Sequence, residues 1–158
     1  MASHSASAGS GAMNERAAAL VAVEEQMRVL MRRIKRTIGE RAAEVHPDLQ
    51  PSSFLILGWL ADHGPARGSS LVEQFHIDKG AISRQVQHLV ELGLVDRTPD
   101  PEDGRATLLS ASAEGVSRMK ETGVARRKIW DDQLEGWTAE ELVAFAGQLR
   151  RLNGDLDD

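Results

Sequence analysis

The chain has 158 residues, the length of about one domain, and 41% of them are hydrophobic, which suffices for one modest core. It contains no cysteine, which excludes a disulfide framework, a thiolate metal site and a cysteine redox switch. No apolar run approaches the roughly 20 residues that a membrane-spanning helix needs, so we expect a cytoplasmic protein. The formal net charge of -5 argues mildly against nucleic-acid binding, because contacts to phosphate draw on Lys and Arg.

The N-terminal third begins with a segment of low complexity. Residues 1–13 are rich in Ser, Ala and Gly and lack apolar periodicity, so we expect them to be disordered, either as a leader or as a remnant of cloning. From Asn14, a suitable N-cap, apolar residues recur at three- and four-residue steps and predict a long helix to about Glu44. A narrow apolar stripe on a long helix favours packing against a partner, so residues 14–48 are interpreted as a dimerisation segment.

The central part of the chain predicts three shorter helices. Pro51 is well placed at the first position of a strongly apolar helix, and a short helix fits between residues 68 and 75. Asp78 is the predicted N-cap of the next helix, and Gly93 is the glycine that ends it. With the segment that follows, residues 49–111 form the predicted DNA-binding region.

Two extended segments follow, Leu94–Thr98 and Ala106–Ser110, joined by a turn-rich loop of Pro, Asp and Gly. A helix followed by a two-stranded hairpin is how a winged helix-turn-helix presents one element to a DNA groove and a second to the flanking backbone. The predicted fold class is therefore mainly α with a small β-hairpin wing.

The C-terminal part predicts two further helices. Ser112 can cap the first of them, and a capping box at Thr138 can begin the second. Because an apolar stripe recurs here, residues 112–153 are interpreted as C-terminal dimerisation helices, and residues 154–158 as an acidic tail.

The polar face of the predicted fourth helix carries the candidate DNA contacts. Arg84 can bond guanine with two hydrogen bonds, and Gln87 can pair with adenine, with His88 beside them. Lys79 and Ser83, near the helix N-terminus, suit phosphate oxygens. A helix of this kind taken alone is more often an ordinary amphipathic surface helix, but the adjacent hairpin favours DNA binding.

The tip of the hairpin carries a second candidate contact. Arg105 can enter a minor groove, where narrow A·T-rich tracts concentrate negative potential; the alternative is a salt bridge to Asp100, Glu102 or Asp103. Phosphate would repel a carboxylate, so Asp103, with Gly104, is assigned to supporting the wing or orienting Arg105.

At this point the residues resemble a known family. The segments LVEQFHIDKGAISRQVQHLVELGLVDR and DPEDGRATLLSASAEG are similar to the MarR family of bacterial winged-helix regulators. They include its D-x-R wing, from Asp103 to Arg105, and a helix signature that ends in Ser83-Arg84. The resemblance extends over residues 14–153, because the long first helix and the two C-terminal helices match the family's dimerisation region.

The resemblance implies a homodimeric regulator that represses promoters through a pseudo-palindromic operator and is released by a small anionic or aromatic ligand. By position, it makes Arg84 the base-reading residue and Arg105 the minor-groove residue. Ala111-Ser112 stands where the family often has Leu-Thr, and the wing is unusually acidic, which weakens the expected wing contact. The alternative function is a winged-helix protein-protein interaction module without sequence-specific DNA binding, since a fold does not fix a function.

An effector pocket is predicted between the first two helices, although apolar residues at helical spacing are more often plain core. The candidate lining residues are Met27, Arg28, Met31, Phe54, Leu57 and Trp59.

Metal and catalytic chemistry find little support. No two of the histidines His46, His63, His76 and His88 stand at the i, i+4 spacing of a helical zinc site, and no metal or cofactor is expected. The sequence lacks a phosphate-binding glycine loop and a nucleophile elbow, so an enzyme is not predicted.

Overall fold

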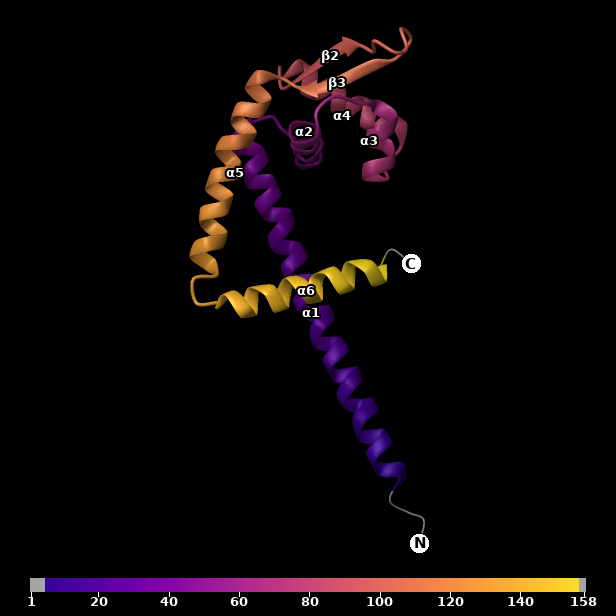
Figure 1. Cartoon of the computed structure of the whole chain (residues 1–158), viewed down its shortest axis with the longest axis vertical. Coiled ribbons are helices and arrows are strands. Elements are labelled where there is room, and N and C mark those ends of the chain that lie inside the picture. The colour runs from indigo at the N-terminus through magenta and orange to yellow at the C-terminus, as the bar shows by residue number, and fades with distance from the viewer. Residues whose placement is uncertain (1–4, 157–158) are drawn as a thin grey trace. The chain divides into compact units, whose positions relative to one another are not determined.

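The structure of the chain, a computed structural model, describes residues 5–156 and is mainly helical (Figure 1). In chain order the elements are α1 (Ser5–Val45), α2 (Pro51–His63), β1 (Ala66–Arg67), α3 (Gly68–Phe75), α4 (Lys79–Glu91), β2 (Val95–Pro99), β3 (Thr107–Ala111), α5 (Ala113–Gln133) and α6 (Ala139–Leu156). They form two compact units, which divide between Met119 and Lys120. None of the helices within residues 5–156 combines the length and apolar character that spanning a membrane requires.

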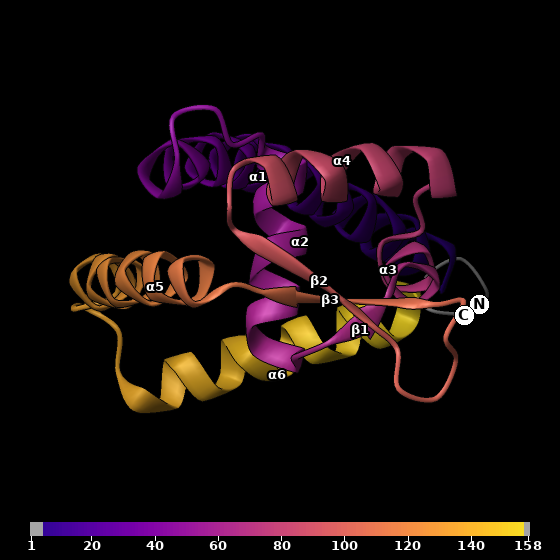
Figure 2. The same ribbon diagram turned by 90° about the horizontal axis from the view of Figure 1, so that it is seen from above.

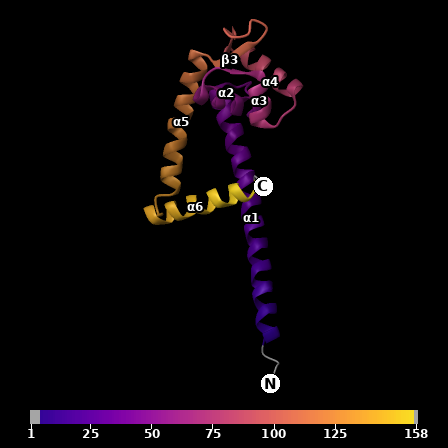
Figure 3. The ribbon, with the colours of Figure 1, turned by 45° about the vertical axis from the view of Figure 1, so that its right-hand side comes forward.

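Helix α1 is longer than the sequence predicts, because it begins at Ser5. The sequence predicts disorder over residues 1–13, whereas the structure includes residues 5–13 in α1, and residues 1–4 lie outside the described part of the chain. Once a helix has nucleated, each added residue gains a hydrogen bond, so a segment that cannot nucleate by itself can still extend it. Figure 3 shows α1 as one continuous helix whose C-terminal end meets α2. There Val45 is buried and its carbonyl accepts a 2.6 Å hydrogen bond from Nη1 of Arg118.

The core of the first unit forms around α2, whose apolar residues contact neighbours on several sides. Ile56, Leu57 and Leu60 of α2 are at most 1% exposed, and Leu71 of α3 and Leu89 of α4 are fully buried. This explains why the sequence of α2 is apolar nearly all round, since a helix enclosed by neighbours has little surface to leave polar. The remaining buried apolar residues are Ala42, Val45, Leu49, Phe54, Ile82, Val86, Leu94, Val95 and Leu109.

The sheet has three antiparallel strands in the order β1-β3-β2. The predicted hairpin is confirmed, with each strand one residue later in the chain, and its ladder runs from Val95 opposite Ala111 to Pro99 opposite Thr107. Figure 2 shows β2 and β3 side by side, with the loop that joins them extending beyond the ladder. Strand β1 was not predicted, because two residues carry no periodicity and are defined only by the partner strand.

The predicted signals that begin and end α4, and the predicted N-cap of α5, are confirmed. The Asp78 side chain accepts a 2.9 Å hydrogen bond from the backbone N–H of Ala81. Gly93 ends α4 with a φ of 71°, in the left-handed region that favours glycine. At the start of α5, the Ser112 hydroxyl accepts from the Gly115 N–H at 3.0 Å and donates to the Gly93 carbonyl at 2.7 Å. Ser112 thus joins the end of α4 to the start of α5.

In the second unit, the predicted capping box of α6 is present. The Thr138 N–H donates to Oε2 of Glu141 at 2.8 Å, and the Glu141 N–H donates to Oγ1 of Thr138 at 3.2 Å. Just before it, the Trp137 ring meets the Phe145 ring edge to face, with 5.6 Å between centroids. The unit leaves several large apolar side chains exposed, among them Ile129, Trp130 and Val143.

Gly115 tests the close packing at the start of α5. A Cβ at this position would collide with the Leu94 carbonyl oxygen and press on Cδ1 of Leu57, both of which lie in the core. We expect Gly115→Ala to lower the free energy of unfolding by about 1–3 kcal/mol, measured by chemical denaturation. The matched control is Gly123→Ala in the same helix, where a Cβ meets nothing within 4 Å. It should leave stability unchanged or raise it by up to about 1 kcal/mol. Equal effects of the two substitutions would contradict this packing argument.

Candidate nucleic-acid interface

Helix α4 presents the face that the sequence predicts for DNA. Ile82, Val86 and Leu89 are buried against the core, which turns the opposite side of the helix outward. The exposed residues of that side include Lys79, Ser83, Arg84 and Gln87, which we call the recognition face. Among the side chains that the structure describes, those of Lys79 and Arg84 make no hydrogen bond or ion pair. Both cations are therefore available to a ligand in solution.

Two of the predicted DNA-contacting residues of α4, Gln87 and His88, are less available to a ligand than Arg84. Nε2 of Gln87 donates to Oε1 of Glu91 at 2.9 Å, so its amide is already oriented by a neighbour one turn later. His88 is only half-exposed and less accessible than Arg84. The Gln87–Glu91 spacing of four residues was a signal available in the sequence, but a polar pair on a helix face does not by itself indicate a role in binding.

The loop between β2 and β3, residues 100–106, is the wing loop. Oδ1 of Asp103 accepts a 3.0 Å hydrogen bond from the Arg105 N–H, and the Asp103 carbonyl accepts from the Ala106 N–H at 2.8 Å. The Arg105 side chain is exposed and, within the described part of the chain, takes part in no ion pair. Gly104 has no left-handed φ, and a Cβ there would enter open space. Asp103, rather than Gly104, therefore shapes the turn that precedes Arg105.

The wing carboxylate Asp100 pairs with Arg67, a residue that sequence reasoning missed. Oδ2 of Asp100 accepts from Nε of Arg67 at 2.7 Å and lies 2.6 Å from its Nη2, and Oδ1 accepts from the Glu102 N–H at 2.9 Å. The Glu102 N–H and the Arg67 guanidinium hold the pKa of Asp100 below its ordinary value, and Asp100 in turn raises the pKa of Arg67. An Asp in a turn is a recognisable sequence signal, but nothing in the sequence identifies a partner 33 residues away.

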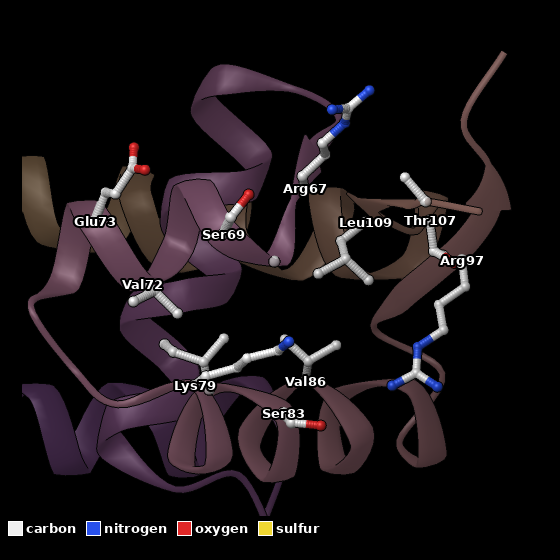
Figure 4. A pocket seen from close by; sticks show the side chains of 13 residues that line it. Arg67, Ser69, Val72, Glu73, Lys79, Ser83, Val86, Arg97, Thr107 and Leu109 are labelled. Atoms are coloured by element: carbon white, nitrogen blue, oxygen red, sulfur yellow. The ribbon is translucent and has the colours of Figure 1, made fainter. Parts of the chain in front are cut away.

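A groove of about 700 Å³ lies between α3, α4 and the sheet (Figure 4). Val72, Val86 and Leu109 point toward its middle, so its lining is largely apolar. Its polar residues include Lys79 and Ser83 of the recognition face, together with Arg67, Ser69, Glu73, Arg97 and Thr107. The groove and the recognition face therefore share two residues.

The structure does not gather the six predicted pocket residues around either of its described cavities. Leu57 and Phe54 are buried in the core, and Trp59 packs at its edge, where its ring stacks on His63 at 4.5 Å. Of the α1 residues, Met27 is half-buried and Met31 exposed. Arg28 pairs with Glu25 at 2.8 Å. The effector site between the first two helices stays a prediction. Across the described residues, no three His, Asp or Glu side chains form a group that could hold a metal ion.

Comparison with known proteins places this arrangement in a family. Residues 48–106 match the model of the MarR family, which covers α2 to the end of the wing loop. The HTH-type transcriptional regulator YxaD of Bacillus subtilis is 34% identical over 106 residues, covering 67% of this chain and 74% of that protein. The chain belongs to the MarR family. MarR-family members are transcriptional regulators rather than enzymes, as the sequence predicts.

Two further proteins are similar to this MarR-family chain, one in sequence and one in fold. The HTH-type transcriptional repressor NicR of Pseudomonas putida is 28% identical over 106 residues, which is 67% of each chain. The crystal structure of an Escherichia coli MarR mutant complexed with operator DNA superposes with a TM-score of 0.66 at 19% identity, covering 84% of this chain and 94% of that one. This likeness concerns the fold, and it confirms the winged helix-turn-helix architecture, mainly helical with a small antiparallel wing.

Proposed function

We propose that this MarR-family regulator is a sequence-specific repressor that binds a pseudo-palindromic operator as a homodimer. The observation that carries the proposal is the recognition face of α4, where Arg84 and Lys79 are exposed and uncommitted. Because its apolar side is fixed in the core, α4 can enter a major groove without rearrangement of the fold. The E. coli relative complexed with operator DNA supports this role.

Each recognition residue has a contact that suits its chemistry. Arg84 can bond O6 and N7 of guanine with its two parallel donors, whereas Lys79 and Ser83, with the N-terminus of α4, suit phosphate oxygens. Gln87 can still offer its amide oxygen and its second amide hydrogen to a base, since Glu91 accepts only one of its two N–H bonds. Arg105, exposed on the wing loop, reaches the adjacent minor groove.

Exposed apolar side chains support the homodimer. On α1, Leu20, Val21 and Val23 are 46–61% exposed, and in the second unit Trp130 and Phe145 are about half-exposed. A monomer rarely leaves so many large apolar residues in water, and a second copy would bury them in an isologous interface. Two recognition helices related by a two-fold axis then enter successive major grooves about 34 Å apart.

Selection of duplexes from a random pool tests sequence specificity and dimer symmetry together. We expect an inverted repeat whose half-site centres lie about one helical turn, or roughly 10 base pairs, apart. A single enriched half-site would contradict the dimer. Enrichment of no sequence, with capture of another protein instead, would favour the interaction module over the repressor.

Arg84→Ala tests the base-reading assignment on the selected duplex. We expect a loss of about 1–3 kcal/mol in binding free energy and a relaxed base preference at one position of each half-site, measured by fluorescence anisotropy. Arg32→Ala, at an exposed arginine of α1, removes the same charge and should leave base preference intact. An Arg84→Ala variant that binds as tightly and selectively as the parent would show that another residue reads the base.

Release by a small aromatic anion is part of the proposal, and the groove beside α4 supports it. Its apolar middle suits an aromatic ring, and Lys79 and Arg97 suit a carboxylate. An occupant would compete with DNA for Lys79 and Ser83. A ligand that binds only the DNA-free form at 100 times its Kd opposes operator binding by about 2.7 kcal/mol.

Salicylate, as a small aromatic anion, is the probe for this release. We expect millimolar salicylate to raise the operator Kd of the parent about tenfold or more, and to change that of Arg97→Ala much less. Arg28→Ala is the matched variant at the pocket predicted between the first two helices. If Arg28→Ala, and not Arg97→Ala, abolishes the salicylate effect, the effector site lies there instead. If salicylate leaves the parent's affinity unchanged, release by aromatic anions is wrong.

A further inference from the structure

We infer that Arg67 is a positioning residue for the wing, whose pairing with Asp100 fixes where Arg105 stands relative to the helix-turn-helix. This inference rests on the proposed role of Arg105 in DNA binding. Arg67 belongs to β1 and directly precedes α3, whereas Asp100 is the first residue of the wing loop. The pair therefore connects the base of the wing to β1, the strand that leads directly into α3.

Both oxygens of the Asp100 carboxylate are engaged, and from different directions. Oδ2 takes the Arg67 guanidinium through Nε and Nη2, at 2.7 and 2.6 Å, while Oδ1 takes the Glu102 N–H at 2.9 Å. The Asp100 side chain is only 5% exposed. A carboxylate so shielded from water requires partners, and a guanidinium bound through two nitrogens has a defined orientation. The Arg67–Asp100 contact is therefore directional as well as attractive.

The other polar contacts of the wing loop lie within the loop. Beyond the ladder pair of Pro99 and Thr107, the Asp100 N–H donates to the Ala106 carbonyl at 3.1 Å. Asp103 accepts from the Arg105 N–H through Oδ1 and from the Ala106 N–H through its carbonyl oxygen. Among the described residues, Arg67 alone supplies a hydrogen bond to this loop from outside the hairpin. Without it, the loop would keep its internal shape but could pivot at the end of the ladder.

The charge of Arg67 adds to this effect. The wing loop carries three carboxylates, Asp100, Glu102 and Asp103, and phosphate would repel them. Besides pairing with Asp100, Arg67 interacts electrostatically with the carboxylates of Glu102 and Asp103, which contribute to the raised pKa of its guanidinium. Arg67 therefore both orients an acidic loop and offsets part of its charge, so that Arg105 can approach DNA.

A double-mutant cycle on the selected operator tests the inference. The readout is the flank preference, the ratio of Kd for duplexes with G·C-rich and with A·T-rich steps beside each half-site, where Arg105 is proposed to enter. Arg105→Ala should abolish this preference. Arg67→Gln should reduce the flank preference by about threefold or more in the parent, but should change it no further in the Arg105→Ala background. Arg67→Lys, which keeps the charge without the two-nitrogen contact, should restore it only in part.

Lys79→Gln is the matched control for loss of one charge. As a phosphate contact, it should weaken both duplexes equally, and its effect should multiply with that of Arg105→Ala. Hydrogen exchange gives a second readout. In Arg67→Gln, the Glu102 amide, which donates to Oδ1 of Asp100, should exchange faster, while the amides of α4 stay as protected as in the parent. Global loss of protection would instead assign Arg67 a purely structural role and overturn the inference.

The cycle separates two kinds of failure. If Arg67→Gln weakens binding equally with and without Arg105, Arg67 contacts phosphate itself, and the positioning role is wrong while DNA binding by the wing stands. If Arg105→Ala changes neither affinity nor flank preference, the proposed wing contact is wrong, and the positioning role fails with it.

Discussion

The burial of one side of α4 is the interaction on which the rest of the site depends. Ile82, Val86 and Leu89 pack into the core around α2 and are at most 3% exposed. A helix anchored by residues three and four apart has only one rotation about its axis that satisfies all of them. That rotation exposes Arg84 and Lys79. Core packing thus holds the recognition face in a fixed orientation, and no flexible segment is needed to present it.

The acidic character of the chain is compatible with DNA binding because of where its charges lie. The formal net charge is -5, yet Asp100 is shielded and paired with Arg67, and Asp103 is bonded to backbone N–H of the same loop. Interactions between exposed charges are screened over about 10 Å at moderate ionic strength, so the local arrangement matters more than the sum. A regulator with a weak uniform attraction to DNA would depend more on base-specific contacts and less on random-site binding.

The groove beside α4 links two proposed ligands through shared residues. Lys79 and Ser83 line the groove and also belong to the recognition face, so a molecule in the groove and a phosphate of DNA would use the same groups. Competition of this kind needs no long-range change between distant sites. A displacement of the paired subunits would be a second route, and the two differ in whether DNA and ligand can be bound at once.

Local signals in the sequence determined the helices, their caps and the polar face of α4, because Asp78, Gly93, Ser112 and the capping box at Thr138 act within a few residues of themselves. The motifs of the wing and of α4 also carried the family resemblance. Only the tertiary structure decided the third strand, the groove and the partner of Asp100. Each of these arises where segments distant in the chain meet: β1 exists only because β3 lies beside it, and Arg67 contacts a residue 33 positions later. Local periodicity carries no information about such pairings, since they depend on how whole elements pack.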